Sequence, residues 1–307
     1  MIINHKISVA IAVYNGEKFL KEQLDSIYAQ TITPFEIIAI DDCSIDNSVA
    51  ILQEYSQKFS LKYVQNEKNL GINKTFEKAF LLCSGDFIAP SDQDDIWAKN
   101  KLEECYKAIL DLPANEPNVV ICNSIIMSEN KKIISKNDYK NKLYKFEDFF
   151  PYINTGGACF LFNSVLKNKA IPFKTALCYD QELAILATLI GNRINIFTTW
   201  RFFRVHSKNA TGMLMNKGFL GKLRYYIHYS LYNNYLRKKN LDSYIEIIEK
   251  YELDINLKKI DFLSKLQNVI INPYKIFFFK EYSFMKKTKV FVIFYICNFF
   301  QFLKRII

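Results

Sequence analysis

The sequence predicts an α/β protein built on a mainly parallel β-sheet, and three observations support this fold class. Apolar runs alternate with amphipathic stretches throughout roughly the first 130 residues. Half of the 307 residues are hydrophobic while glycine and proline are scarce, so the chain can bury a substantial core. The repeated order of one apolar run and one helical pattern is typical of parallel strands joined by crossing helices.

The individual elements follow from this alternation. Short apolar runs predict five strands, at residues 6–15, 35–42, 61–66, 86–90 and 118–127. Apolar residues at helical spacing predict the intervening helices, at residues 17–30, 46–58, 72–83 and 97–110.

From residue 151 the pattern is less regular. A strand entered through a glycine pair is expected at 154–163, and a helix that ends at a glycine is expected at 179–191. A further strand at 193–197 and a polar loop at 202–212 close this part of the chain.

Positive charge is concentrated in the last third of the sequence. The net charge is +10, and residues 214–307 contain 17 Lys and Arg against 7 Asp and Glu, so this region carries the whole excess. We therefore divide the chain into a domain at 1–213 and a basic, aromatic-rich helical region at 214–307. Its basic residues are interleaved with Phe, Tyr, Ile and Leu, which favours an anionic membrane surface over nucleic acid as its partner.

The chain's final apolar segment is short. Val290–Leu303 is an uncharged run of 14 residues, whereas a membrane-spanning helix needs about 20. We expect a helix lying in the membrane interface. The alternative is a helix packed on the first domain or on a second subunit of a homo-oligomer.

The cysteines and the first residues indicate a cytoplasmic protein. The seven cysteines form neither a CxxC pair nor a metal-ligand spacing, and several lie in apolar runs, so we expect reduced, buried thiols. The first residues read as a strand and not as a signal peptide. With the basic region, this predicts a protein held peripherally on the inner face of the cell membrane.

Polar and acidic residues gather where the predicted strands end. These ends read VYNGE, DDCS, QNEKNLG and PSDQDD, and ligands of parallel sheets bind at the carboxyl ends of strands. The sequence has neither GxGxxG after its first strand nor GxxxxGK[ST]. A bound nucleotide would therefore need a divalent cation to offset its phosphates.

The acidic stretch SDQDD is a candidate cation site. Asp92 and Asp94 are two residues apart, so in an extended chain both side chains leave the same side. Mg²⁺ and Mn²⁺ prefer such carboxylate oxygens and keep positions open for phosphates. The alternative is a solvated turn in which Asp95 caps the following helix.

Seven segments in order extend this interpretation. They are ISVAIAVYNGEKFLKEQLDSIYAQT, FEIIAIDDCSIDNS, NLGINKTFEKA, APSDQDDIW, NTGGACFLFN, YDQELAILATLIG and FRVHSKNATG. Together they resemble the inverting family-2 glycosyltransferases of the GT-A fold, over about residues 6–213. SDQDDIW is similar to the rhamnosyltransferase-type members. The resemblance implies a Rossmann-like sheet flanked by helices, and an enzyme of lipopolysaccharide or capsule synthesis that transfers a sugar to a glycan or lipid-linked glycan.

The resemblance implies a donor site for a nucleotide sugar, most fittingly a UDP- or dTDP-sugar. Asp42 would recognise the base by hydrogen bonding, with Asp41 as the less certain partner, and one of the pair caps the turn instead. The residues implied beside the base are Val13, Tyr14, Asn15 and Glu17.

The resemblance also implies residues around the diphosphate and a cofactor, Mn²⁺ or Mg²⁺. Asp94 would bind the metal, with His206 near the metal or diphosphate, and Asp92 would contact the donor. Lys74 matches a basic position near the nucleotide, although it can also be a solvated helix residue.

Asp180 is the implied general base, because inverting transfer must deprotonate the acceptor hydroxyl. Glu182 is the second candidate. A carboxylate at a helix N-terminus is also favoured by the helix dipole without any catalytic role. Tyr179 and Gln181 stand where relatives often carry other residues, which leaves the acceptor open.

Two other functions remain open from the sequence. The chain could be a catalytically silent nucleotide-sugar-binding or scaffolding subunit of a polysaccharide assembly complex. It could also be a nucleotidyltransferase on a similar sheet, but it lacks the glycine- and arginine-rich first loop expected for that chemistry.

Overall fold

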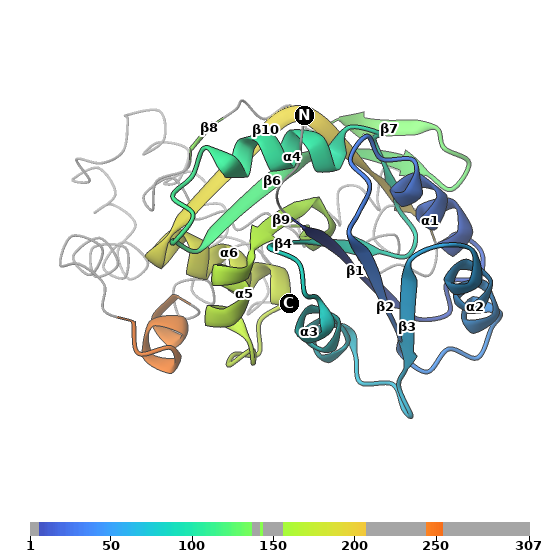
Figure 1. The fold of residues 1–307 in the computed structure, drawn as a ribbon, viewed down its shortest axis with the longest axis horizontal. Coiled ribbons are helices and arrows are strands. Elements are labelled where there is room, and N and C mark those ends of the chain that lie inside the picture. The colour runs from blue at the N-terminus through green and yellow to red at the C-terminus, as the bar shows by residue number, and fades with distance from the viewer. Residues whose placement is uncertain (1–5, 137–141, 144–155, 207–243, 254–307) are drawn as a thin grey trace, which may run out of the picture. The chain divides into compact units, whose positions relative to one another are not determined.

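The computed structural model describes residues 6–136, 142–143, 156–206 and 244–253 (Figure 1). The chain divides into two compact units, Met1–Lys145 with Asn154–Val205, and Phe146–Ile153 with His206–Ile307. In the second unit the structure describes His206 and residues 244–253, which include a helix at 244–250. The rest of the predicted C-terminal region, including its 14-residue apolar run and the boundary at 213, lies outside the described residues. Within the described part, no helix combines the length and apolarity needed to cross a membrane.

The first half of the large unit alternates strands and helices as the sequence predicts. In chain order the elements are β1 (Ile7–Val13), α1 (Leu20–Tyr28), β2 (Glu36–Asp41), α2 (Ser48–Lys58), β3 (Leu61–Gln65), α3 (Ile72–Leu82) and β4 (Phe87–Asp92). Figure 1 shows α1 and α2 on one side of strands β1–β3 and α3 on the other.

The second half has longer strands and shorter helices. In chain order its elements are β5 (Ile96–Trp97), α4 (Lys101–Leu110), β6 (Asn118–Ser128), β7 (Ile133–Lys136), β8 (Lys142–Leu143), the 3₁₀ helix η2 (Gly157–Cys159), β9 (Phe160–Asn163), α5 (Ser164–Ala170), α6 (Tyr179–Ile190) and β10 (Asn192–Val205).

The ten strands found in the described residues form one sheet in the order β3-β2-β1-β4-β9-β6-β10-β5, with β7 on β6 and β8 on β10. The pairs β1–β2, β2–β3, β1–β4 and β6–β10 are parallel. Strand β9 runs antiparallel between β4 and β6. The chain order reverses between β1 and β4, which creates a topological switch point, and ligands of such sheets bind at the carboxyl ends of the strands there.

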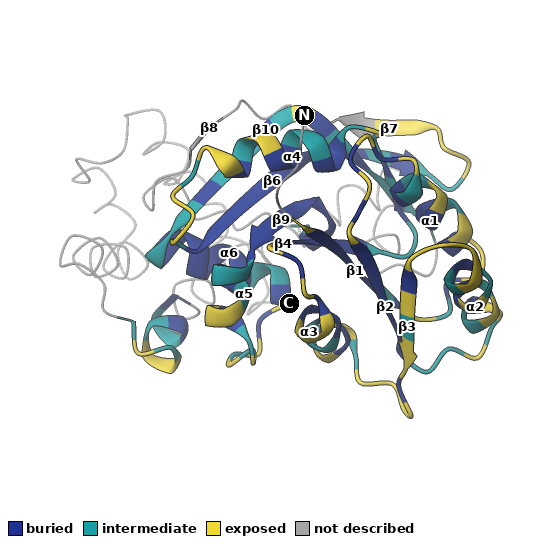
Figure 2. Ribbon diagram, in the orientation of Figure 1, coloured by how far each residue is buried: buried dark blue, intermediate teal, exposed yellow. Residues whose placement is uncertain are grey.

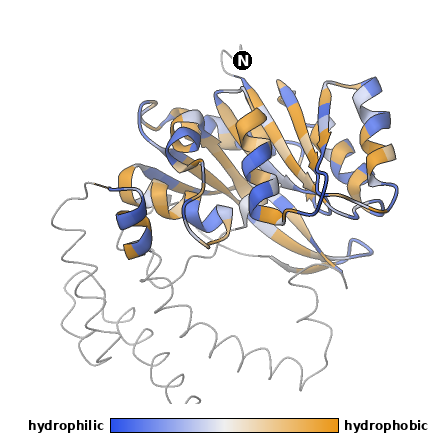
Figure 3. Ribbon diagram, turned by 90° about the horizontal axis from the view of Figure 1, so that it is seen from below, coloured by the Kyte–Doolittle hydropathy of each residue, from blue (hydrophilic) through white to orange (hydrophobic). Residues whose placement is uncertain are grey.

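The core lies between the sheet and its helices. All six residues of β2 are buried, as expected for a strand covered on both faces. On α3 the buried residues Phe76, Ala79 and Phe80 recur at helical spacing and face the sheet. Strands β1, β2 and β6 are accordingly mostly buried in Figure 2, whereas the edge strand β3 is largely exposed, and apolar residues predominate on the sheet in Figure 3.

The cysteines agree with a reduced protein. All six within the described residues are free. The buried ones are Cys83, Cys105, Cys122 and Cys159.

Two predicted elements, the helix starting at Trp97 and the strand at 193–197, have different bounds in the structure. The helix expected from Trp97 begins at Lys101, because Trp97 belongs to β5 and pairs with Arg201. The strand expected at 193–197 continues to Val205, so the predicted polar loop at 202–212 is wrong over its first four residues. A register shift between Asn195 and Trp200 lets β10 stay paired with β6 along this length.

Candidate active site

The loop after β1 is fastened to the loop after β2. Val13 ends β1 buried and lies opposite Asp41 of β2. Asn15 has a φ of 51°, which asparagine tolerates better than most residues. Its N–H donates to Ser44 Oγ (2.9 Å), and its Oδ1 accepts from the Ile45 N–H (2.9 Å). These contacts bring the predicted base-binding residues to the carboxyl ends of the strands.

Tyr14 and Glu17 have different partners in the same region. The Tyr14 N–H donates to Gln93 Oε1 (2.7 Å), and its carbonyl accepts from Gln93 Nε2 (2.8 Å). The middle residue of SDQDD thus holds the first loop. Glu17 Oε2 accepts from both the backbone N–H and the side chain of Asn47, each at 3.1 Å. The Tyr14 ring is 47% exposed and available to a ligand.

Asp42 holds the loop that leads into α3. It accepts hydrogen bonds from Asn66 Nδ2 (2.8 Å), the Leu70 N–H (2.8 Å) and the Gly71 N–H (2.9 Å). Burial alone would raise the pKa of Asp42, but these hydrogen bonds outweigh burial and lower it. Gly71 has a φ of 81°, which side chains disfavour. Base recognition by Asp42 stays a prediction.

Asp41 is fully buried and caps the turn after β2. Its Oδ2 accepts from the Ser44 N–H (3.0 Å), whereas its Oδ1 forms no hydrogen bond within the described residues. Both aspartates therefore stabilise loops, and the Asp41 carboxylate accepts fewer hydrogen bonds than that of Asp42.

Lys74 lies in the first turn of α3. Its side chain is 59% exposed, and its Nζ lies 2.9 Å from Glu77 Oε1 on the same helix. This is a contact within one helix, and the nucleotide role of Lys74 stays a prediction.

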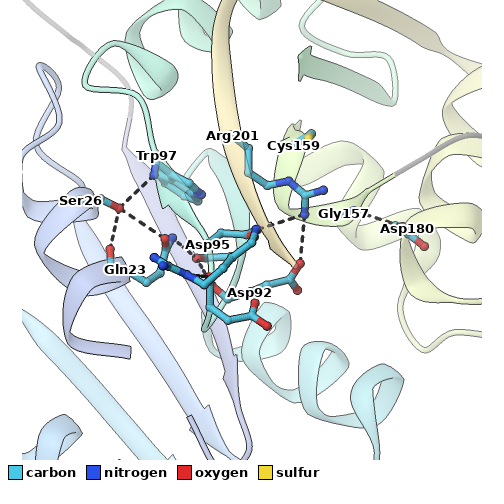
Figure 4. Close-up of polar contacts among 12 residues, drawn as sticks. Gln23, Ser26, Asp92, Asp95, Trp97, Gly157, Cys159, Asp180 and Arg201 are labelled. Carbon is cyan, nitrogen blue, oxygen red and sulfur yellow. Dashed lines mark hydrogen bonds and ion pairs between the residues drawn. The ribbon is translucent and has the colours of Figure 1, made fainter. Parts of the chain in front are cut away.

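The acidic stretch is not a solvated turn. Arg201 Nη1 lies 3.2 Å from Asp92 Oδ2 and 3.1 Å from Asp95 Oδ2 (Figure 4). Asp95 is fully buried and lies six residues before α4, whose N-cap is Asn100. The interpretation of Asp95 as a helix cap is therefore wrong, because its carboxylate forms a buried ion pair instead.

The electrostatics connect Asp92 to residues far along the chain. Burial raises the pKa of Asp92 to about 6; Arg201 opposes this rise, while the neighbouring charges of Asp94 and Asp180 add to it. The pKa of Asp95 is raised well above its usual value, by burial first, with Arg201 again opposing. The predicted donor contact, metal ligand and base thus form one electrostatic cluster.

Asp180 sits in the first turn of α6. Its Oδ2 accepts from the Gly157 N–H (3.1 Å) and its Oδ1 from the Gln181 N–H (2.8 Å) (Figure 4). Asn73 of α3 holds this helix end in place, because its side chain bonds the Tyr179 N–H (3.0 Å) and the Leu177 carbonyl (2.6 Å). The predicted base is therefore anchored from two directions.

Glu182 is poorly suited to act as the base. It is fully buried, and its carboxylate accepts from the Lys174 N–H (2.9 Å) and from Thr175 Oγ1 (2.7 Å). These contacts fix the segment before α6 and leave Asp180 as the base candidate.

Two arginines and a lysine at this site were not predicted from the sequence. Besides Arg201, Arg204 is buried and donates from Nε to the Asp94 carbonyl (2.9 Å). The Lys101 ammonium is also buried and lies 3.5 Å from the centre of the Trp97 ring. The available signal was the spacing of the two arginines within the aromatic run WRFFRV.

The predicted metal site contains carboxylates, but the described residues do not form a complete set of metal ligands. Across the described residues, no group of three or more His, Cys, Asp or Glu side chains is gathered to hold a metal ion. Mg²⁺ commonly binds through one or two carboxylates plus substrate phosphates, so such a group is not required. His206 begins the second unit, and its role as a metal ligand stays a prediction.

The switch point between β1 and β4, with the acidic stretch ending β4, defines a GT-A fold. Staphylococcus aureus TarS in complex with UDP-GlcNAc aligns with a TM-score of 0.59 over 88% of this chain and 72% of that chain, at 18% identity. A Pyrobaculum calidifontis mannosyltransferase in complex with GDP-Man and Mn²⁺ aligns with a TM-score of 0.52 over 97% of this chain and 87% of that chain, at 15% identity. At these identities the likeness confirms the predicted fold alone.

The family follows from the sequence match. The model of Glycosyl transferase family 2 matches residues 8–170, more than half of the chain, so the chain belongs to this family. A cholesterol galactosyltransferase of Borreliella burgdorferi is 24% identical over 95% of this chain and 78% of its own length. An uncharacterized glycosyltransferase of Methanocaldococcus jannaschii is 31% identical over 58% of this chain, and the match spans 60% of that protein.

Proposed function

We propose that the protein is an inverting glycosyltransferase that uses a UDP- or dTDP-sugar as donor. The observation that carries the proposal is the cluster of Asp92, Asp94 and Asp180, drawn from the carboxyl end of β4 and the N-terminus of α6. A divalent cation bound by such a cluster would hold the leaving diphosphate on one side, and a carboxylate on the other side could accept a proton. Structural similarity to UDP-bound TarS supports a nucleotide-sugar donor.

The reaction we propose is a single displacement. The acceptor hydroxyl oxygen attacks the anomeric carbon of the sugar from the face opposite the diphosphate. The bond from that carbon to the phosphate oxygen breaks, and the nucleoside diphosphate leaves with the electron pair. Asp180 takes the hydroxyl proton as this happens. The dipole of α6 stabilises its carboxylate form and limits its basicity, so we expect proton transfer late in the displacement.

The residues present fit a divalent cation, Mn²⁺ or Mg²⁺. The four carboxylates of Asp92, Asp94, Asp95 and Asp180 outnumber the three buried cations of the site, which are Arg201, Arg204 and Lys101. A donor diphosphate would add further negative charge. Asp94 would hold the cation, which when bound would stabilise the charge of the leaving diphosphate. The mannosyltransferase solved with Mn²⁺ supports the use of a divalent cation.

We propose a hydroxyl of a surface glycan or lipid-linked glycan as the acceptor. Matched relatives include a poly(ribitol-phosphate) β-N-acetylglucosaminyltransferase, 36% identical over 102 residues, and the cholesterol galactosyltransferase. The basic, aromatic-rich region at 214–307 would hold the protein peripherally on an anionic membrane where such acceptors lie.

The experiment is a turnover assay with UDP-, dTDP- and GDP-sugars, with and without Mn²⁺. Acceptors would include a lipid-linked glycan, a ribitol-phosphate polymer and a sterol. We expect Mn²⁺-dependent release of nucleoside diphosphate from one donor class, and a product of inverted anomeric configuration. Donor binding without turnover across all acceptors would instead support a silent binding subunit.

A further inference from the structure

Arg201 links the donor side of the site to the base. It projects from β10, is 9% exposed at its side chain, and shares Nη1 between Asp92 Oδ2 and Asp95 Oδ2 (Figure 4). Neither SDQDD nor the family resemblance singled out this residue.

The two carboxylates that Arg201 holds differ in exposure. The Asp95 side chain is 0% exposed, whereas that of Asp92 is 29% exposed. The buried partner fixes the guanidinium, and the guanidinium in turn fixes Oδ2 of the accessible partner. Because the Asp92 side chain is partly exposed, a nucleotide-sugar donor can reach it.

The other edge of the guanidinium faces a glycine pair. A Cβ added to Gly156 would lie 2.8 Å from Arg201 Nη2, so the guanidinium packs directly against this glycine. The next residue, Gly157, donates its N–H to Asp180 Oδ2 (3.1 Å). One guanidinium therefore lies between Asp92 and the turn that holds the candidate base.

We propose that Arg201 is a positioning residue that sets the placement of Asp92 relative to Asp180, the latter through the Gly156–Gly157 turn. This inference rests on the proposed glycosyltransferase function. Its consequence is a coupling between donor and acceptor: when the placement is lost, water still attacks a bound donor, but the acceptor hydroxyl and the base are no longer aligned.

The test must separate positioning from stability. Arg201→Gln alone leaves Asp95 as a buried carboxylate without its cation, which destabilises the fold. We therefore pair it with Asp95→Asn in a double variant whose buried pair is neutral. Arg201→Lys keeps the charge but loses the fork of the guanidinium. Glu36→Gln is the matched control, because it neutralises a buried carboxylate at the amino end of β2, away from the site.

Each full-length variant is measured for melting temperature, donor hydrolysis, and kcat and KM of acceptor transfer with Mn²⁺. We expect Arg201→Gln/Asp95→Asn to melt close to the wild type, yet to lose about a hundredfold in transfer kcat, the scale of a misplacement of about 1 Å. Hydrolysis should fall less than tenfold, so the ratio of transfer to hydrolysis drops. Arg201→Lys should recover part of the transfer rate, and Glu36→Gln should leave the ratio unchanged.

Two results would overturn the inference while the proposed function stands. One is a double variant that transfers sugar like the wild type. The other is an equal loss of hydrolysis and transfer in proportion to the loss of stability. That result would show that Arg201 has only a structural role. A wild-type protein that turns over no nucleotide sugar would contradict the proposed function, and the inference with it.

Discussion

Asp180→Asn is the most direct test of the proposed chemistry. The replacement keeps the size of the side chain and retains one oxygen that can accept from the Gly157 N–H. It removes the negative charge and the acceptor that faces the Gln181 N–H. The helix contacts of Asn73 are untouched.

The expected effects on stability and on rate differ in size. Losing one hydrogen bond costs about 1 kcal/mol, and losing a carboxylate at a helix N-terminus costs about 0.3–1 kcal/mol. The free energy of unfolding should therefore fall by no more than about 2 kcal/mol. Loss of a general base lowers the rate by about 10²–10⁴, equivalent to about 2.7–5.4 kcal/mol in the barrier. The catalytic effect should thus exceed the structural one.

The assay is single-turnover transfer at saturating donor, with urea unfolding measured on the same preparations. Glu182→Gln is the matched control: it also removes a carboxylate from the first turn of α6, but from a buried position bonded to Lys174 and Thr175. We expect this control to lose stability while keeping its rate at a permissive temperature. An Asp180→Asn protein that keeps more than about a tenth of the wild-type rate would refute its assignment as the base.

Three further predictions concern stability, packing and the cation. Burial alone would raise the pKa of Glu36, but hydrogen bonds from groups including Ser84 outweigh it and hold the pKa below its ordinary value. The folded pKa is therefore below the unfolded one, and Glu36 stabilises the fold fully above about pH 4.3, with the effect lost as pH falls further. Glu36→Gln should lower the free energy of unfolding by about 1.5–3 kcal/mol at pH 7, and urea titrations at pH 7 and 3.5 should show the gap closing; a gap independent of pH contradicts this. Gly157→Ala would put a Cβ 1.9 Å from Tyr179 Oη, so calorimetry should show a destabilisation of about 1–3 kcal/mol; an unchanged melting temperature would show that the ring yields freely. Chelation of divalent cations should abolish turnover, and Asp94→Asn should raise the Mn²⁺ concentration for half-maximal activity by about tenfold or more; full activity in EDTA would rule out the cation.

The first half of the fold could be predicted because its signals are local. Strands β1, β2 and β4 contain buried apolar runs, the edge strand β3 is a short five-residue segment, and the helices between them bury residues at helical spacing. The resemblance of the ordered segments to family 2 then supplied the GT-A arrangement, which the family match and the solved structures confirm.

The second half of the large unit was harder to predict, because the extent of its strands depends on pairing between segments far apart in the sequence. The segment RFFRV has two phenylalanines between two arginines, so it reads as part of a polar loop if the arginines are taken as solvated. In the structure β10 pairs with β6, and each arginine meets an acidic or carbonyl partner contributed by residues about 110 positions earlier. No local pattern contains that information.

The different environments of the aspartates in the acidic stretch could not be predicted from the local sequence either. Spacing places Asp92 and Asp94 on one side of an extended chain, but it cannot indicate which carboxylate of the stretch is buried. That depends on where the guanidinium of Arg201 lies. Glu182 is a second example. It lies two residues from Asp180 in the sequence, but only the structure shows that its side chain is buried and therefore poorly suited to act as the base.

These residues explain how clustered carboxylates can be held at the end of a buried strand. Repulsion among Asp92, Asp94 and Asp95 would favour an open, solvated turn. Arg201 offsets the charge of Asp92 and Asp95, and Arg204 Nε donates to the Asp94 carbonyl. The protein's own cations therefore stabilise the shape of the turn without neutralising all of it. The negative charge that is left is what a divalent cation and, behind it, a donor diphosphate require.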